Sequence, residues 1–234
     1  ENGAGKSTLS NIISAAVPKS SGKMLFDGNP VELIDVHHAG ELGVAHVHQE
    51  LMLIGSLSVA ENVFLGNEPV ARWWTGRLDR KSMNEETRRI LHDLGMDIDP
   101  AKPVAALSMA RKQMIEIARA LQLRSRILIL DEPTDTLTQS STEELFRTIR
   151  RLKENGVAIV YISHRLEELA RIADRITILR DGKLRGTFKR DAITIPQIIN
   201  RMVGRDVEGS RQPRTQRSSA EPVLEVKDLS RTGV

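Results

Sequence analysis

The first eight residues of the chain, ENGAGKST, contain the residue types of a phosphate-binding loop. Gly3 and Gly5 let the backbone curl so that successive N–H groups point toward one anion. The Lys6 ammonium can then reach terminal phosphates, and the Ser7 hydroxyl can ligate Mg²⁺. Because the pattern G-x-x-x-x-G-K-[ST] puts its first glycine one residue ahead of Glu1, we expect the sequence to be a fragment.

An amphipathic helix is expected directly after this loop. Leu9, Ile12, Ile13 and Ala16 recur at helical spacing, and the face stops before Pro18. The positive end of the helix dipole would then lie under the phosphates. The alternative is a glycine-rich turn before an ordinary helix.

Two acids follow an apolar run that predicts a strand covered on both faces. The run is Ile127–Leu130, and Asp131 and Glu132 come next. Adjacent residues at a strand end point to opposite faces, so one carboxylate can bind Mg²⁺ through its water shell while the other faces a different reacting atom. We assign Asp131 to the metal and Glu132 to water. Two solvated acids at a strand end are the alternative.

Two further polar residues follow predicted strands. Residues 43–48 form a short strand that leads to Gln49, and residues 157–163 form an apolar strand that leads to His164. Open α/β sheets bind ligands at the carboxyl ends of their strands. A lone histidine in this position is more often structural, so the case for His164 depends on its neighbours.

The other patterns predict an α/β core interrupted by helices. A capping box, Ser141-x-x-Glu144, begins a helix whose inward residues are Leu145, Phe146, Ile149 and Leu152, and this helix completes a βαβ unit. Further expected elements are hairpins at 23–31 and 176–188, a helical insertion at about 51–106 that contains a helix at 80–94, and a helix at 111–123.

Composition restricts the class of protein. Hydrophobic residues make up 40% of the 234 residues but aromatic residues only 3%, which favours the aliphatic core of a parallel sheet. The sequence has no cysteine, which excludes disulfide scaffolds and thiolate metal sites. It also has no apolar run long enough for a membrane span. Net charge is +3 without a concentrated basic run, so no nucleic-acid partner is expected.

Five elements in order resemble the nucleotide-binding domain of ATP-binding cassette (ABC) transporters. They are ENGAGKST, Gln49 in HVHQELMLIGSLSVAENVFLG, Leu107-Ser108 in LSMARKQMIEIARAL, ILILDEPTDTLT and YISHRLEEL. The resemblance covers nearly the whole chain, and it is closest to the ATPase subunit of bacterial ribose-, galactose- and xylose-type sugar importers. It implies an α/β P-loop NTPase with a mainly parallel sheet core, an inserted helical subdomain and missing N-terminal strands.

This resemblance implies ATP hydrolysis with Mg²⁺. The ATP phosphates would be bound by Asn2, Gly3, Ala4, Gly5, Lys6, Ser7 and Thr8. The metal would be bound by Ser7, Gln49 and Asp131. Glu132 would act as the general base or polarise the water, His164 would sense the γ-phosphate, and Gln49 would contact the attacking water and transmit closure to a permease.

The signature sequence of the family departs from its usual form in this chain. Leu107-Ser108 is followed by Met109-Ala110-Arg111, where relatives carry Gly-Gly-Gln or a close variant. Ser108 would contact the ATP held by the opposite domain. The Ala110 methyl group lies where backbone should approach a γ-phosphate. We hypothesise two unequal ATP sites, so Ala110→Gly should raise the ATPase turnover of the complete protein.

The resemblance also implies domains, partners and a location. Residues 1–204 would form a first nucleotide-binding domain, the polar stretch 205–222 a linker, and residues 223–234 a stub of a second. Expected partners are integral membrane permease subunits, the second ABC domain of the same polypeptide and, indirectly, a periplasmic sugar-binding protein. The expected location is peripheral, on the cytoplasmic face of the bacterial inner membrane.

Two other functions stay open. One is a soluble ABC-class ATPase that acts on nucleic acid or in translation, although the segment 57–66 resembles importers. The other is a nucleotide-sensing cassette with weak hydrolysis, against which the intact Glu132 and His164 argue. A metal site at His46 and His48, and a partner contact through Trp73-Trp74, are weaker alternatives to structural roles.

Overall fold

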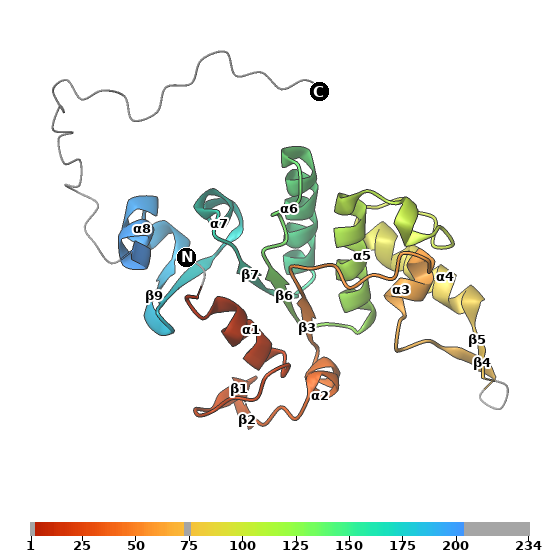
Figure 1. The fold of residues 1–234 in the computed structure, drawn as a ribbon, viewed down its shortest axis with the longest axis horizontal. Coiled ribbons are helices and arrows are strands. Elements are labelled where there is room, and N and C mark those ends of the chain that lie inside the picture. The colour runs from red at the N-terminus through yellow and green to blue at the C-terminus, as the bar shows by residue number, and fades with distance from the viewer. Residues whose placement is uncertain (1–2, 73–75, 204–234) are drawn as a thin grey trace, which may run out of the picture.

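A parallel three-stranded sheet forms the centre of the computed structural model, which describes residues 3–72 and 76–203 (Figure 1). Its strands are β3 (Val44–Val47), β6 (Ile127–Asp131) and β7 (Ala158–Ile162), in the order β3-β6-β7. Both neighbours run parallel to β6. The predicted parallel sheet core is therefore confirmed, and the carboxyl ends of all three strands lie at one edge.

Helices and short hairpins surround this sheet. The α-helices are α1 (Lys6–Ile13), α2 (Val36–Glu41), α3 (Val59–Val63), α4 (Arg80–Asp93), α5 (Met109–Gln122), α6 (Gln139–Glu154), α7 (Leu166–Ile172) and α8 (Ile195–Val203). The 3₁₀ turns are η1 (Val104–Ala106) and η2 (Arg190–Ala192). The antiparallel hairpins are β1 (Met24–Phe26) with β2 (Asn29–Val31), β4 (Val70–Arg72) with β5 (Arg77–Leu78), and β8 (Arg175–Arg180) with β9 (Lys183–Lys189).

Strand β6 is buried on both faces, as its apolar run predicts. Leu128 and Leu130 pack into a core that includes residues of α5 and α6. Ile129, which points to the opposite face, packs with Ala39 of α2 and Ile13 of α1. Alternate residues of one strand thus contribute to two separate cores.

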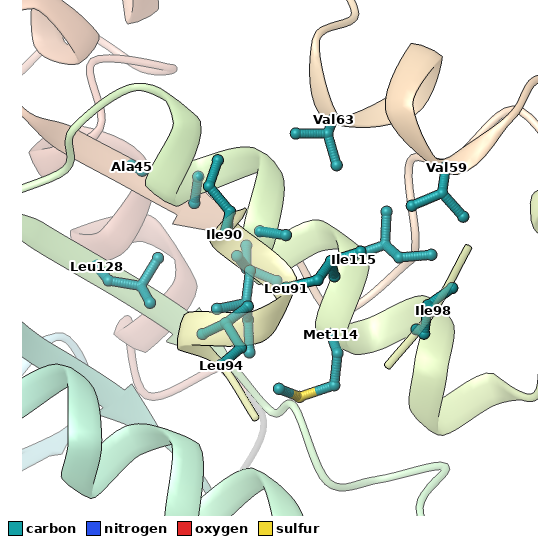
Figure 2. Close-up of a cluster of buried hydrophobic side chains, with 14 of the residues drawn as sticks. Ala45, Val59, Val63, Ile90, Leu91, Leu94, Ile98, Met114, Ile115 and Leu128 are labelled. Atoms are coloured by element: carbon teal, nitrogen blue, oxygen red, sulfur yellow. The ribbon is translucent and has the colours of Figure 1, made fainter. Parts of the chain in front are cut away.

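The insertion between β3 and α5 packs tightly into the same core as Leu128 and Leu130 of β6. Residues of α3, α4 and α5 interlock there, among them Val59, Leu91 and Ile115 (Figure 2). The insertion is not wholly helical, because β4 and β5 form a hairpin within it. Trp73 and Trp74 lie outside the described residues.

Two sequence predictions about helices need correction. Helix α6 begins at Gln139, and its N-cap is Thr138, whose side-chain oxygen accepts from the Ser141 amide at 3.4 Å. The capping box predicted at Ser141 is therefore wrong, because the helix starts most of a turn earlier. In α1, Leu9 is 44% exposed while Ser10 is buried, so the predicted apolar face is only partly buried.

The open side of the sheet explains the exposure of Leu9. Strand β7 pairs with β6 on one edge, and no described strand pairs with its other edge. A cavity of about 300 Å³ beside α1 and one of about 490 Å³ beside α6 separate β7 from β8. Leu9 borders the first of these cavities. In the described part of the chain, no helix has the length and apolar character needed to cross a membrane.

Candidate active site

The glycine-rich loop at the start of the chain leads into α1 as predicted. Gly5 is the N-cap of the helix, with φ of 92°, and its carbonyl accepts from the Leu9 amide at 3.0 Å. Gly3 also has a positive φ, of 85°. The Ala4 carbonyl accepts from the Gly182 amide, in the β8–β9 turn, at 3.3 Å. The loop is therefore held between its own helix and a turn from the far end of the chain.

A polar cleft of about 700 Å³ opens beside this loop. The lining residues are Gly3, Ala4, Gly5, Lys6, Ser7, Thr8, Gln49, Glu132, Asp135 and His164. One wall is the loop with the first turn of α1, where backbone N–H groups and the helix dipole favour an anion. The other wall carries residues that follow β3, β6 and β7.

Two side chains that follow separate strands, His164 and Gln49, converge on Glu132. His164 Nδ1 lies 3.4 Å from Glu132 Oε2. The Gln49 side-chain amide donates to the same Glu132 oxygen at 3.5 Å and to Asp135 Oδ2 at 3.4 Å. The Glu132 side chain is only 14% exposed. A water held by this carboxylate would face the phosphate loop across the cleft.

The backbone at Glu132 differs from the simple strand alternation assumed from the sequence. Strand β6 ends at Asp131, and Glu132 adopts a left-handed conformation with φ of 48°. Its amide donates to the Ile162 carbonyl of β7 at 2.9 Å. A left-handed non-glycine residue costs about 1 to 2 kcal/mol. Asp131 is buried and does not line the cleft, so the two acids differ in accessibility.

Asp135 is a cleft residue that sequence reasoning missed. Ligand atoms of Glu132, Asp135 and His164 lie within 4.8 Å of one another, the one such group of three among the described residues. The available signal was a third acid in the turn DEPTD, three residues after Glu132. The residues predicted to bind metal, Ser7, Gln49 and Asp131, offer hydroxyl, amide and carboxylate oxygens, which suit Mg²⁺.

Glu116 of α5 holds the segment that follows Gln49. Its Oε1 accepts from the Met52 amide at 2.7 Å. Burial raises the pKa of the Glu116 carboxyl group. This contact joins the Gln49 segment to the helix that begins at the signature sequence.

Other predicted residues lie away from the cleft. Ser108 is the exposed N-cap of α5, and Ala110 follows in the first helical turn, so their roles toward an opposite domain stay predictions. Asn2 lies outside the described residues. His46 is part-buried, with its Nδ1 3.3 Å from the Ser14 hydroxyl oxygen. Burial and the neighbouring His48 lower the pKa of His46 to about 4.

Comparison with known proteins agrees with this geometry. The family described as ABC transporter matches residues 1–135. The chain is 47% identical to a ribose import ATP-binding protein of Rubrobacter xylanophilus, over all of this chain and 46% of that protein. It is equally identical to a putative ribose/galactose/methyl galactoside import ATP-binding protein of Agrobacterium fabrum, with the same coverage. The chain thus spans about half the length of these curated relatives.

Solved structures share the fold. A nucleotide-free ATP-binding cassette from an ABC transporter superposes with a TM-score of 0.74 at 20% identity, over 86% of this chain and 84% of that one. CbiO1 from Clostridium perfringens, part of the cbiONQ ABC transporter complex, superposes with a TM-score of 0.68 at 26% identity. The match covers 82% of this chain and 75% of that one.

The parallel sheet, the glycine-rich loop and the helix behind it define a P-loop nucleotide-binding fold. Within that class, the chain belongs to the ABC transporter family.

Proposed function

We propose that this chain is a nucleotide-binding domain of an importer ATPase that binds and hydrolyses ATP to power monosaccharide uptake. The observation that carries the proposal is the meeting of Gln49, Glu132 and His164 across a cleft from the phosphate loop. The similarity to ribose and galactose import proteins supports the sugar class.

The chemistry follows from this arrangement. Backbone N–H groups of residues 3–5 and the Lys6 ammonium bind the phosphates. Glu132 orients a water molecule, whose oxygen bonds to the γ-phosphorus as the bond to the bridging oxygen breaks, and the water's proton passes to this carboxylate. His164 and Gln49 hold Glu132 and the γ-phosphate in place. Ser7 and Gln49 would hold Mg²⁺, with Asp131 acting through the water shell of the ion, and the ion would supply charge neutralisation at the phosphates.

The proposed organisation extends beyond the cleft. Residues 1–204 form a first nucleotide-binding domain, residues 205–222 a linker, and residues 223–234 the beginning of a second domain. The domain works with integral membrane permease subunits, peripherally on the cytoplasmic face of the bacterial inner membrane. A periplasmic binding protein supplies the sugar, and nucleic acid is not a partner. The 46% coverage of the first relative supports a longer polypeptide with a second domain.

Glu132→Gln tests the reaction. Removing a general base lowers the rate about 100-fold or more, while the phosphate loop still binds nucleotide. ATP turnover and the affinity for a fluorescent ATP analogue are measured in the polypeptide as its gene encodes it. The matched control is Glu144→Gln, at an exposed acid on α6. This variant should hydrolyse ATP at the same rate as the unsubstituted protein. Undiminished hydrolysis in Glu132→Gln would instead favour a nucleotide-sensing domain with another source of activity.

Uptake measurements test the transport role. Cells that carry Glu132→Gln at the chromosomal gene should lose uptake of labelled ribose or galactose, whereas cells with Glu144→Gln should not. The protein should copurify with a membrane permease. Copurification with nucleic acid, and unchanged uptake of both sugars, would favour the soluble ATPase.

A further inference from the structure

Glu168 is a buried carboxylate that lies behind the cleft and does not line it. It belongs to α7 and is 7% exposed. Its Oε2 accepts from the Tyr161 hydroxyl at 2.7 Å, the Thr134 hydroxyl at 2.9 Å and the Ser163 hydroxyl at 3.2 Å. A single oxygen thus joins β7, the turn after β6 and the loop after β7.

The buried Glu168 carboxylate destabilises the fold unless hydrogen bonds replace the water that it loses. Taking a carboxylate out of water is unfavourable, and an apolar side chain of similar size often packs in such a place at no loss of stability. The three hydroxyl groups replace hydration with charge-assisted hydrogen bonds. Arg165 adds an ion pair, with its Nη1 3.5 Å from Glu168 Oε1. Burial also raises the pKa of Tyr161, which keeps its hydroxyl a donor.

The two loops joined by Glu168 are those that carry Glu132 and His164. Thr134 is fully buried and comes two residues after Glu132. Ser163 directly precedes His164, and its hydroxyl oxygen also accepts from the Arg165 amide at 2.9 Å. Besides the hydrogen bond of the Glu132 amide to the Ile162 carbonyl at the end of β7, the link described on the cleft side is the 3.4 Å contact of His164 with Glu132. Glu168 therefore fixes from behind the spacing that this contact needs.

The unusual backbone at Glu132 makes such support necessary. A left-handed glutamate relaxes toward the ordinary helical or strand regions unless its neighbours hold it. One restraint is its amide hydrogen bond to Ile162. The bond from Thr134 to Glu168 restrains the other end of the same turn.

We propose that Glu168 is a positioning residue for hydrolysis, which holds the Glu132 turn and the His164 loop at their working distance. This role rests on the proposed function, since it presupposes that Glu132 and His164 act together on ATP. Glu168 does not line the cleft beside the phosphate loop. Its loss should therefore reduce turnover without reducing nucleotide affinity.

The first experiment compares two neighbouring glutamates in the polypeptide as its gene encodes it. Glu168→Gln keeps the shape but removes the charge and one acceptor oxygen, so kcat should fall about 10- to 100-fold. KM for ATP and the affinity for a fluorescent ATP analogue should change less than about twofold. Glu167→Gln, on the exposed face of the same helix, should retain the kcat of the unchanged protein. Rates are expressed per mole of bound nucleotide, so that unfolded protein is not counted.

A second pair of variants keeps the test decisive if Glu168→Gln folds poorly. Thr134→Val removes the hydroxyl at constant shape and should lower kcat severalfold, whereas Thr134→Ser keeps the hydroxyl and should stay close to the unchanged rate. Tyr161→Phe retains the edge-on packing of the ring against Phe146 but loses the hydrogen bond to Glu168. Its kcat should also fall, by less than that of Thr134→Val.

The outcomes separate this role from the proposed function. An unchanged kcat in Glu168→Gln and in Thr134→Val, beside an active unchanged protein, would overturn the positioning role alone. A parallel loss of nucleotide affinity would also overturn it, because that result indicates general damage to the fold. Absence of ATP hydrolysis in the unchanged protein would overturn the proposed function and this role with it.

Discussion

The helical insertion and the β7–β8 side of the molecule contain similar apolar residues but bury them to different extents. In the insertion, Val59 and Leu91 are almost completely buried, as is Ile115 of the adjoining α5. Beside β7, Leu9 is 44% exposed and Val160 is 37% exposed, and two cavities lie between β7 and β8. An apolar pattern shows that a side chain suits a core, whereas burial requires packed elements on every side.

Leucine truncation on the two sides should give the largest difference. Leu130→Ala, at a residue with 0% exposure, should lower the free energy of unfolding by about 3 to 5 kcal/mol through lost contacts and a cavity. Leu9→Ala should lower it by less than about 1 kcal/mol. Denaturant unfolding of both variants measures the contrast, and equal losses would contradict it.

Substitution of polar residues should show the same contrast between the two regions, with smaller changes in the free energy of unfolding. Asn62 of α3 has 0% exposure and joins the preceding loop to its helix. Its Nδ2 donates to the Ile54 and Ser58 carbonyls at 3.0 and 2.9 Å, and its Oδ1 accepts from the Ile54 amide at 2.8 Å. Asn62→Ala leaves these buried groups unpaired and should cost about 2 to 4 kcal/mol in unfolding experiments.

The control for Asn62 lies on the open side. Thr177 and Thr187 form an exposed cross-strand hydroxyl pair at 3.0 Å between β8 and β9. Thr187→Val should change the free energy of unfolding by less than about 0.5 kcal/mol, because water replaces the lost partner. A loss as large as that of Asn62→Ala would remove the distinction between the two regions.

Acid should weaken the fold through His46 of β3, whose effect is smaller than that of the Leu130 truncation. Its pKa is about 4 in the folded chain and 6.5 as the ordinary value, so only the unfolded chain binds a proton between these values. Stability is therefore lost as pH falls from 6.5 toward 4, by about 2 kcal/mol at pH 5. In His46→Asn this part of the pH dependence should disappear from unfolding curves taken at pH 7 and pH 5. An unchanged slope would assign acid sensitivity to other groups.

Much of the fold followed from the sequence because strand and helix periods were clear. The apolar run at 127–130 and the strand at 157–163 gave the parallel pairing, and this pairing explains why Gln49, Glu132 and His164 lie at one edge. Their catalytic roles stay predictions. The helical reading of the insertion missed β4 and β5, whose strands are too short to show a period.

Residues whose position depends on three-dimensional packing were beyond sequence reasoning. Asp135 lies in a turn without periodicity, so nothing local predicts that it faces Gln49. Glu167 and Glu168 are adjacent and chemically identical, and only the rotation of α7 against the β6 turn decides which one is buried. The predicted burial of Leu9 failed because α1 faces a cavity on that side.

The hydrogen bond from Gly182 to Ala4 has a consequence for the order of events during synthesis. A ribosome releases the phosphate loop first and its clamp close to the end of the described chain. Until the β8–β9 turn emerges, the nascent polypeptide presents glycines without the partner that fixes their curvature. The phosphate loop therefore gains this restraint only once Gly182 has left the exit tunnel, well after the glycines of the loop.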